Sequence, residues 1–369
     1  MIRWRPRRLG VQRRAVFVVE RVASLAGRVH VAARGARRAQ YDEPHVFTGK
    51  RVLVIINPAS GKAKPEVAER TIATALEAVD ASFELRTTGA PDHPRAWARA
   101  AGGEGFDVVL AAGGDGTVTA VATGLLESDE PVPLGIVPMG TGNGLARVLR
   151  LPMDTAKAIE AMHEGHELAL DVVQVDSHGS IALFFLGAGL DAEINRDADS
   201  ASKKRFGFLA YVGAAARNLW GRRNHSVDLT TDDRRETFEA HTVTGFNAGQ
   251  FELVGFDVGP DVDPHDGYLD ITVMRSPGFW TSLAAVLRLA SGQREASMNF
   301  RRARSFRIDA RPPLLVHIDG DVVGSTPVTG AVLPGALRVI AAEDYPNPRR
   351  AERTQNDETS ATTADTGAG

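Results

Sequence analysis

Short apolar runs alternate with amphipathic stretches along residues 50–150. The apolar runs are typical of buried strands. The stretches between them repeat apolar residues every three to four positions, which predicts helices. Strands that alternate with helices form right-handed βαβ units around a parallel sheet. The strands are predicted at 50–58, 82–88, 107–112 and 132–138, and the helices at 65–79, 94–101, 117–127 and 145–150.

From about Asp171 the runs become short, β-rich and separated by turn signals, which predicts an antiparallel sheet or sandwich. Two helix-like stretches interrupt it, at 203–220 and 281–292. The expected fold class is α/β, with a parallel-sheet domain followed by a mainly antiparallel, sandwich-like β-rich domain. We expect four parts along the chain. Residues 1–47 form an arm, and residues 48–168 form the α/β domain, which 325–345 completes. Residues 169–324 form the β-rich domain, and 346–369 a disordered tail.

The net charge of −3 conceals a strong asymmetry. Residues 1–41 contain eleven arginines and one acid, Glu20, so this arm carries +10 and the remainder −13. Its apolar residues fall on one side of a helical wheel, which predicts a basic amphipathic helix that can lie on an anionic membrane surface. A solvated extension, a helix packed on the body and a targeting segment stay open. Nucleic acid is not expected, because aromatic residues are sparse there and no known binding module is present.

The chain has no cysteine, which excludes disulfides and thiolate metal sites and is consistent with a reducing cytoplasm. The longest uncharged run lies between Glu130 and Arg147. It is too short for a transmembrane helix and is broken by Gly, Pro and Asn. We therefore expect a cytoplasmic protein that the arm attaches peripherally to the inner face of the membrane.

Three turns of small residues follow three of the predicted parallel strands: NPASGK at 57–62, GGDGT at 113–117 and MGTGN at 139–143. Such turns expose backbone N–H groups that can bind phosphate, and the carboxyl ends of parallel strands share one edge of the sheet. Each turn alone is also an ordinary strand-to-helix connection. Three at one edge favour a phosphate site. None matches a Walker A loop or a dinucleotide fingerprint.

Asp115 stands inside the second turn, where a carboxylate would repel phosphate unless a cation lies between them. Mg²⁺ binds one or two carboxylates together with phosphate oxygens and water. The residue therefore indicates a metal–phosphate site. A solvated acid in an Asp-Gly turn is the simpler alternative.

The three turns, in this order and spacing, resemble those of the diacylglycerol kinase catalytic domain family, which includes bacterial lipid kinases, sphingosine kinases and ceramide kinases. The resemblance covers residues 50–343 and implies Mg²⁺-dependent transfer of phosphate from ATP to a lipid hydroxyl, with diacylglycerol as the expected acceptor. It continues through GAGLDA (187–192), KKRFGFLAY (203–211), FNAGQFE (246–252), DPHDGYLDITV (263–273) and HIDGD (317–321).

The resemblance also implies which residues bind the nucleotide and the metal ions. Asp115 would organise the catalytic Mg²⁺, while Asp263, Asp266 and the carbonyl of Tyr268 would hold a structural Mg²⁺. The expected ATP contacts are Asn57, Ala59, Ser60, Gly61, Lys62, Thr88, Gly113, Gly114, Asp115, Gly116, Thr117, Val118, Thr119, Gly140, Thr141, Gly142 and Asn143.

Asp321 stands where the family often has the Glu of a DGE motif, and the resemblance implies that it accepts the proton of the lipid hydroxyl. Asp319 could share this work, since strand alternation would place both acids on one face. The chain departs from the family at three positions. Gly144 replaces an acid after GTxN, and Thr119 and Ala120 replace Asn-Glu after the second turn, which leaves open what orients Asp115.

Other functions stay open at this point. The acceptor could be a sphingoid base, ceramide, phosphatidylglycerol or a polyprenol. The chain could also be a soluble kinase with a GGDG motif, such as an NAD kinase, or a non-catalytic lipid- or nucleotide-binding protein. Nothing in the sequence specifies the oligomeric state, and a homodimer stays open.

Removal of residues 1–45 should weaken sedimentation of the protein with anionic vesicles, because it removes the positive charge of the arm. Binding of the full-length chain should fall steeply as salt rises, since exposed charges are screened. Neutral vesicles provide the control. Equal binding by the full-length and shortened forms would refute the membrane role of the arm.

Overall fold

A computed structural model of the 369-residue chain describes residues 45–60, 64–189, 225–232, 234–248, 262–275 and 298–346. The described residues belong to one compact unit. The predicted amphipathic arm, the two helix-like stretches at 203–220 and 281–292 and the predicted tail beyond Pro346 lie outside the described residues. Among those that are described, no helix is both long and apolar enough to cross a membrane.

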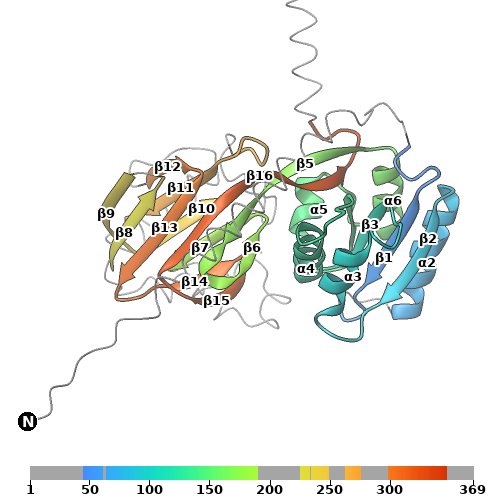
Figure 1. The fold of residues 1–369 in the computed structure, drawn as a ribbon, viewed down its shortest axis with the longest axis horizontal. Coiled ribbons are helices and arrows are strands. Elements are labelled where there is room, and N and C mark those ends of the chain that lie inside the picture. Colours follow the sequence, from blue (N-terminus) through green and yellow to red (C-terminus); the bar gives the residue numbers. More distant parts are fainter. Residues whose placement is uncertain are drawn as a thin grey trace, which may run out of the picture. The chain divides into compact units, whose positions relative to one another are not determined.

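Four parallel strands form one part of a ten-stranded sheet (Figure 1). They are β1 (Arg51–Ile56), β2 (Ser82–Thr87), β3 (Val108–Gly113) and β4 (Leu134–Pro138), in the spatial order β2-β1-β3-β4. β3 and β4 are buried along their whole length, which explains their continuous apolar sequences. The strand order reverses between β1 and β3. The carboxyl ends of these two strands therefore mark the topological switch point, where ligands of such sheets bind.

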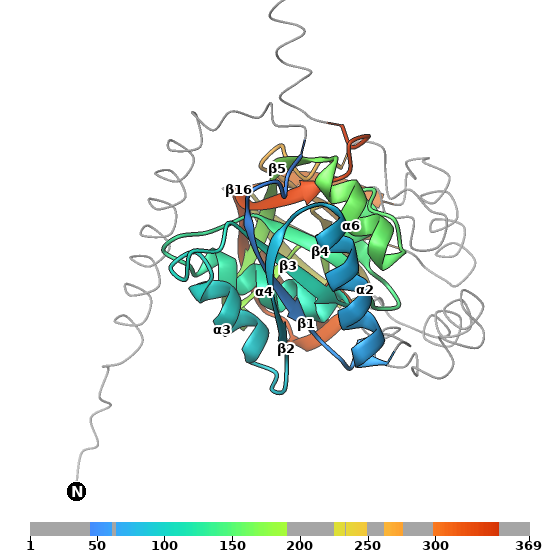
Figure 2. The same ribbon diagram turned by 90° about the vertical axis from the view of Figure 1, so that its right-hand side faces the viewer.

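Helices cover both faces of the parallel strands (Figure 2). α2 (Pro65–Ala78) contacts α6 (Thr155–His163) on one face, and α3 (His93–Ala100) contacts α4 (Asp115–Leu126) on the other. The α3–α4 contact depends on Gly124, where a Cβ atom would lie 2.2 Å from the carbonyl oxygen of Arg95. The short helix α5 (Gly144–Val148) follows the third turn.

Two long strands continue the sheet beyond β4. β5 (His166–Val175) and β16 (Val328–Ala341) pair antiparallel, and β16 also pairs with β4 through Val339 and Leu134. A bulge interrupts the β5–β16 register between Leu333 and Leu337. β6 (Ser180–Ala182) pairs with β5, and the order after β16 is β13 (Ser305–Arg311), β8 (His225–Thr231) and β9 (Arg234–Ala240).

A second sheet of six antiparallel strands packs its buried side chains into a common core with β8, β13 and β16. Its order is β12 (Met298–Ala303), β11 (Leu269–Met274), β10 (Thr242–Phe246), β7 (Phe185–Gly189), β14 (Leu315–Ile318) and β15 (Asp321–Ser325). The predicted fold class is confirmed: a mostly parallel α/β sheet is followed by an antiparallel β-rich region. The domain boundaries themselves stay a prediction.

The HIDGD segment is not the continuous strand that the sequence pattern predicts. Ile318 pairs with Asp321, so Asp319 and Gly320 form a two-residue hairpin turn with positive φ angles of 49° and 94°. Asn, Asp and Gly favour such turns, whose twist matches that of the flanking strands. Strand alternation therefore does not apply to Asp319 and Asp321, and the two acids face different surroundings.

Candidate active site

The three glycine-containing turns follow β1, β3 and β4 and lie at the carboxyl edge of the parallel sheet. Asn57 joins the first turn to the second. Its Nδ2 donates a hydrogen bond to Oγ1 of the buried Thr117 at 3.0 Å, and its Oδ1 accepts one from the N–H of Ala59, also at 3.0 Å. The asparagine side chain thus shapes its own turn and fixes it to the start of α4.

The second and third turns approach each other closely through their backbones. A Cβ atom on Gly140 would lie 2.5 Å from the Cα of Gly114, so the contact requires glycine. Asn143 has the left-handed conformation, with a φ of 53°. Its side chain closes the third turn by accepting from the N–H of Gly140 at 2.8 Å and donating to the Gly140 carbonyl at 2.9 Å.

Asp115 begins α4 and binds the third turn directly. Its Oδ2 accepts the N–H of Asn143 at 3.0 Å, and its Oδ1 accepts the N–H of Gly144 at 2.6 Å. Gly142 completes the contact, since a Cβ there would lie 2.5 Å from Oδ2. The backbone therefore orients this carboxylate in place of the Asn-Glu pair that the chain lacks. Hydrogen bonds to an ionised group are the stronger kind.

The other expected ATP contacts differ in their exposure to solvent. Gly116 and Thr141 are exposed, whereas Val118 is 3% exposed and packs in the core. Thr88 directly follows β2, and its N–H donates to the Ile56 carbonyl at 2.8 Å. Gly61 and Lys62 lie outside the described residues.

Asp319 is held by a row of backbone donors. Its Oδ2 accepts the N–H of Leu183 at 2.8 Å, and its Oδ1 accepts those of Phe184 and Phe185 at 2.9 and 3.1 Å. Burial raises the pKa of Asp319 to about 6; the three N–H donors lower it and the charge of Asp115 adds to the rise. The charge of Asp115 thus acts on Asp319, although the two residues are far apart in the sequence.

Asp321, the expected proton acceptor, begins edge strand β15 with an exposed side chain. Its carboxylate makes no hydrogen bond to any other described residue. The neighbouring Val322 is also exposed, at 40%. The hairpin thus presents Asp321 outward, directly after the turn that Asp319 fixes.

The turn at 263–268 contains the residues expected to hold a structural Mg²⁺. Asp266 accepts the N–H of Tyr268 at 2.9 Å through Oδ1, and its Oδ2 pairs with the guanidinium of Arg302, which lies 4.8 Å from the centre of the Tyr268 ring. Asp263 accepts the N–H of His265 at 3.0 Å. Within the described ranges, no group of three or more His, Cys, Asp or Glu side chains could hold a metal ion. The expected ligands are two carboxylates and a backbone carbonyl, and Asp266 is paired with Arg302, so the structural Mg²⁺ site stays a prediction from which we derive no step.

Asp171, which the sequence does not single out as functional, fixes the 263–268 turn through its carboxylate. Its Oδ2 accepts the N–H of Gly267 at 2.6 Å and its Oδ1 that of Gly335, in the β16 bulge, at 2.7 Å. Burial raises the pKa of Asp171, and the two N–H groups lower it. A buried carboxylate that pairs with glycine N–H groups gives only a weak signal in the sequence.

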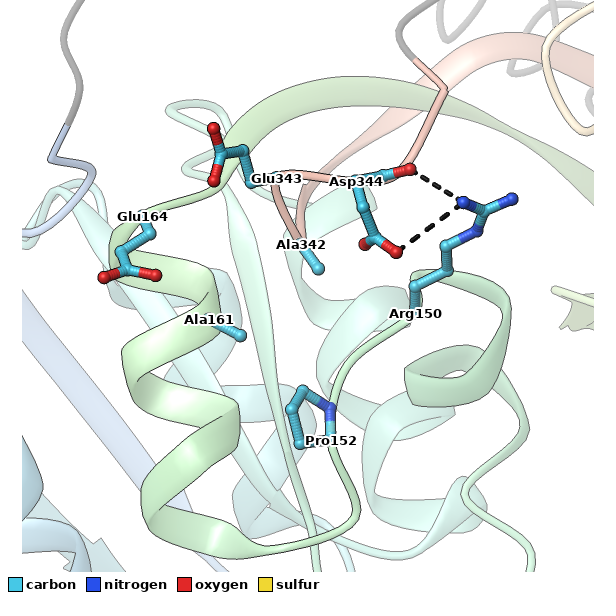
Figure 3. A pocket seen from close by; sticks show the side chains of 7 residues that line it. All are labelled: Arg150, Pro152, Ala161, Glu164, Ala342, Glu343 and Asp344. Carbon is cyan, nitrogen blue, oxygen red and sulfur yellow. Dashed lines mark hydrogen bonds and ion pairs between the residues drawn. The ribbon is translucent and has the colours of Figure 1, made fainter.

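A cavity of about 490 Å³ lies between the segment 150–164, which includes α6, and residues 342–344 directly after β16 (Figure 3). Its charged lining residues are Glu164, Glu343, Asp344 and Arg150, and Arg150 binds the carbonyl of Asp344 at 2.8 Å. No residue of the three turns lines it. Because carboxylates predominate, its charge does not suit a phosphate.

Comparison with known proteins agrees with this architecture. Residues 51–175 match the diacylglycerol kinase catalytic domain, and residues 185–341 match the YegS C-terminal NAD kinase beta sandwich-like domain. A diacylglycerol kinase of Staphylococcus saprophyticus is 28% identical over 305 residues, which cover 81% of this chain and 97% of that protein. A protein of Staphylococcus haemolyticus, provisionally named a lipid kinase, is 30% identical over 246 residues, covering 63% of this chain and 76% of the relative.

The same similarity extends to solved structures. A crystal structure of a provisionally named diacylglycerol kinase from Bacillus anthracis matches with a TM-score of 0.69 and 25% identity, over 81% of this chain and 98% of that chain. The chain belongs to the diacylglycerol kinase catalytic domain family, followed by the YegS-type C-terminal domain. It is a lipid kinase of this family, and its phosphate donor is ATP.

Replacing Asp319 by Asn should flatten the pH dependence of stability between about pH 4 and 6. The raised pKa of Asp319 means that the folded state holds this proton more tightly, so its stabilising contribution is full below the unfolded pKa and is lost as pH rises through about 6. Urea unfolding of both proteins from pH 4 to 7 measures the difference. Parallel pH curves would show that Asp319 is not protonated in this range.

Proposed function

We propose that the protein transfers the γ-phosphoryl group of ATP, with Mg²⁺, to the free hydroxyl of diacylglycerol at the membrane surface, giving phosphatidic acid. The observation that supports this most is the connection of three phosphate-competent turns through Asp115 and Asn57. The relative named diacylglycerol kinase, 28% identical, favours diacylglycerol as the acceptor. A soluble NAD-kinase-like activity is disfavoured, because the family phosphorylates lipids.

The turns suit the phosphates of ATP. The first turn of α4 leaves the N–H groups of Asp115 and Gly116 without helical acceptors, and a helix N-terminus favours anions. At the exposed Gly116 an added Cβ would meet nothing within 4 Å, so a phosphate can approach the main chain there. Phosphoryl transfer needs mainly positioning and charge stabilisation, which such rigid backbone donors supply.

Asp115 would hold the catalytic Mg²⁺. The site fits, because each carboxylate oxygen uses one lone pair for a backbone N–H and keeps the other free. When bound, Mg²⁺ would neutralise charge on the phosphates and act as a Lewis acid. The nearby charge of Asp319 also favours a cation at this place.

Asp321 would accept the proton of the lipid hydroxyl as the hydroxyl oxygen takes the phosphoryl group and ADP leaves. Its exposed carboxylate can be reached by a lipid, whereas three backbone donors already occupy the oxygens of Asp319. In this scheme Asp319 fixes the hairpin and Asp321 takes the proton. The arm at 1–47 would bring the enzyme to the anionic inner face of the membrane. A homodimer is not needed.

The acceptor is tested with labelled ATP, Mg²⁺ and a panel of lipids in mixed micelles, followed by identification of the product. We expect labelled phosphatidic acid from diacylglycerol. Labelling of ceramide, a sphingoid base or phosphatidylglycerol instead would replace diacylglycerol as the substrate. Labelling of NAD, with no lipid product, would overturn the proposal.

Replacing Asp321 by Asn should lower kcat by about 100-fold or more and leave the KM for ATP nearly unchanged, because general-base catalysis contributes about 10²–10⁴ in rate. Asp321→Glu is the matched control and should keep most of the activity, since it retains a carboxylate at the same exposed position. A near-normal kcat in Asp321→Asn would remove this residue from the reaction.

A further inference from the structure

Phe184 connects the surroundings of the two site carboxylates. Its side chain is 2% exposed and belongs to the core cluster of the parallel sheet. The ring lies against Gly144 of α5, where an added Cβ would be 3.1 Å from Cζ and 3.3 Å from Cε1. The aromatic ring thus fills the space that a side chain at position 144 would need.

The backbone of Phe184 belongs to the row of donors around Asp319. Its N–H donates to Oδ1 of Asp319 at 2.9 Å. Its carbonyl accepts the N–H groups of Asn247 and Ala248 at 2.7 and 3.2 Å, and Nδ2 of Asn247 also binds the carbonyl of Leu183 at 2.9 Å. The peptide is therefore fixed on the side away from Asp319 by a fully buried asparagine.

Gly144 lies between the Phe184 ring and Asp115 and contacts both. Gly144 donates its N–H to Oδ1 of Asp115 at 2.6 Å, and the Phe184 ring presses on Gly144. One residue therefore touches the donor that orients Asp115 with its ring and binds Asp319 with its backbone. A rigid aromatic side chain loses little freedom and can set a spacing that a flexible one cannot.

We propose that Phe184 is a positioning residue that keeps Asp115 and Asp319 in register, so that the phosphate turns and the hairpin carrying Asp321 face the same reacting groups. This inference rests on the proposed function for its catalytic meaning. A ring that only filled the core would affect stability and leave the alignment of Asp115 unchanged.

The test is a double-mutant cycle in the full-length protein. Gly144→Ala forces a Cβ against the ring, and Phe184→Leu removes the ring while keeping the backbone donors. Each single variant should weaken binding of Mg²⁺·ADP, measured by calorimetry, and should lower kcat with the lipid substrate. In Gly144→Ala/Phe184→Leu the added Cβ has room, so the combined loss should be at least about fivefold smaller than the product of the two single losses.

Phe106→Leu provides the control. Phe106 is 2% exposed in the same core cluster, where Arg51 stacks on its ring, and it lies outside the site. It should lower the melting temperature while nucleotide affinity and kcat stay at the wild-type values. Should Gly144→Ala not fold, Phe184→Leu alone is compared with Phe106→Leu, and only the former should lose nucleotide affinity.

Two outcomes would overturn the inference: multiplicative losses in the cycle, or equal nucleotide affinity in Phe184→Leu and Phe106→Leu. Failure of the proposed function looks different. In that case the wild-type protein gives no lipid product, while the calorimetric cycle with Mg²⁺·ADP still reports whether the ring orients Asp115.

Discussion

The hydrogen bonds that the Asp115 carboxylate accepts from the N–H groups of Asn143 and Gly144 are the constraint on which the site depends. They join the turn after β3 to the turn after β4, where two backbones meet at Gly114 and Gly140 with no room for a side chain. Asn57 adds the turn after β1 through Thr117. A carboxylate fixed in this way lies at the edge of the sheet, where the helix N-terminus and the free backbone donors favour phosphate.

In the proposed site, the β-rich region contributes through a small number of directional hydrogen bonds. Asp319 caps the N–H groups of Leu183, Phe184 and Phe185, and this fixes the hairpin that presents Asp321. The charges of Asp115 and Asp319 interact, so the separation of the two carboxylates matters for the cation and the phosphates that bind there. Asp171 stabilises the opposite end of this connection by binding the 263–268 turn and the β16 bulge. The two parts of the fold therefore share one polar framework.

The sequence predicts the parallel strands, four of the helices and all three turns, because glycine, asparagine and apolar runs have direct conformational meaning. It does not predict α6, although Asp154 caps that helix by accepting the N–H groups of Ala156 and Lys157 at 3.1 Å. It also assigns Asp319 to a strand, because alternation cannot show that Ile318 pairs with Asp321. The partners of Asp266 and Asp115 are backbone groups or an arginine 36 residues away, and such long-range pairs leave no local pattern. The family resemblance gives the class of reaction, while the geometry shows which expected residues meet.

The most direct test of the account is a crystal structure of the full-length protein with Mg²⁺ and a non-hydrolysable ATP analogue. The account predicts that the β- and γ-phosphates bind the backbone of the three turns and that Mg²⁺ lies about 2.1 Å from an Asp115 oxygen. It also predicts that the hydrogen bonds from Asn143 and Gly144 to Asp115 persist. Phosphates bound elsewhere, such as in the cavity beside Arg150, or a metal ion without contact to Asp115, would contradict it.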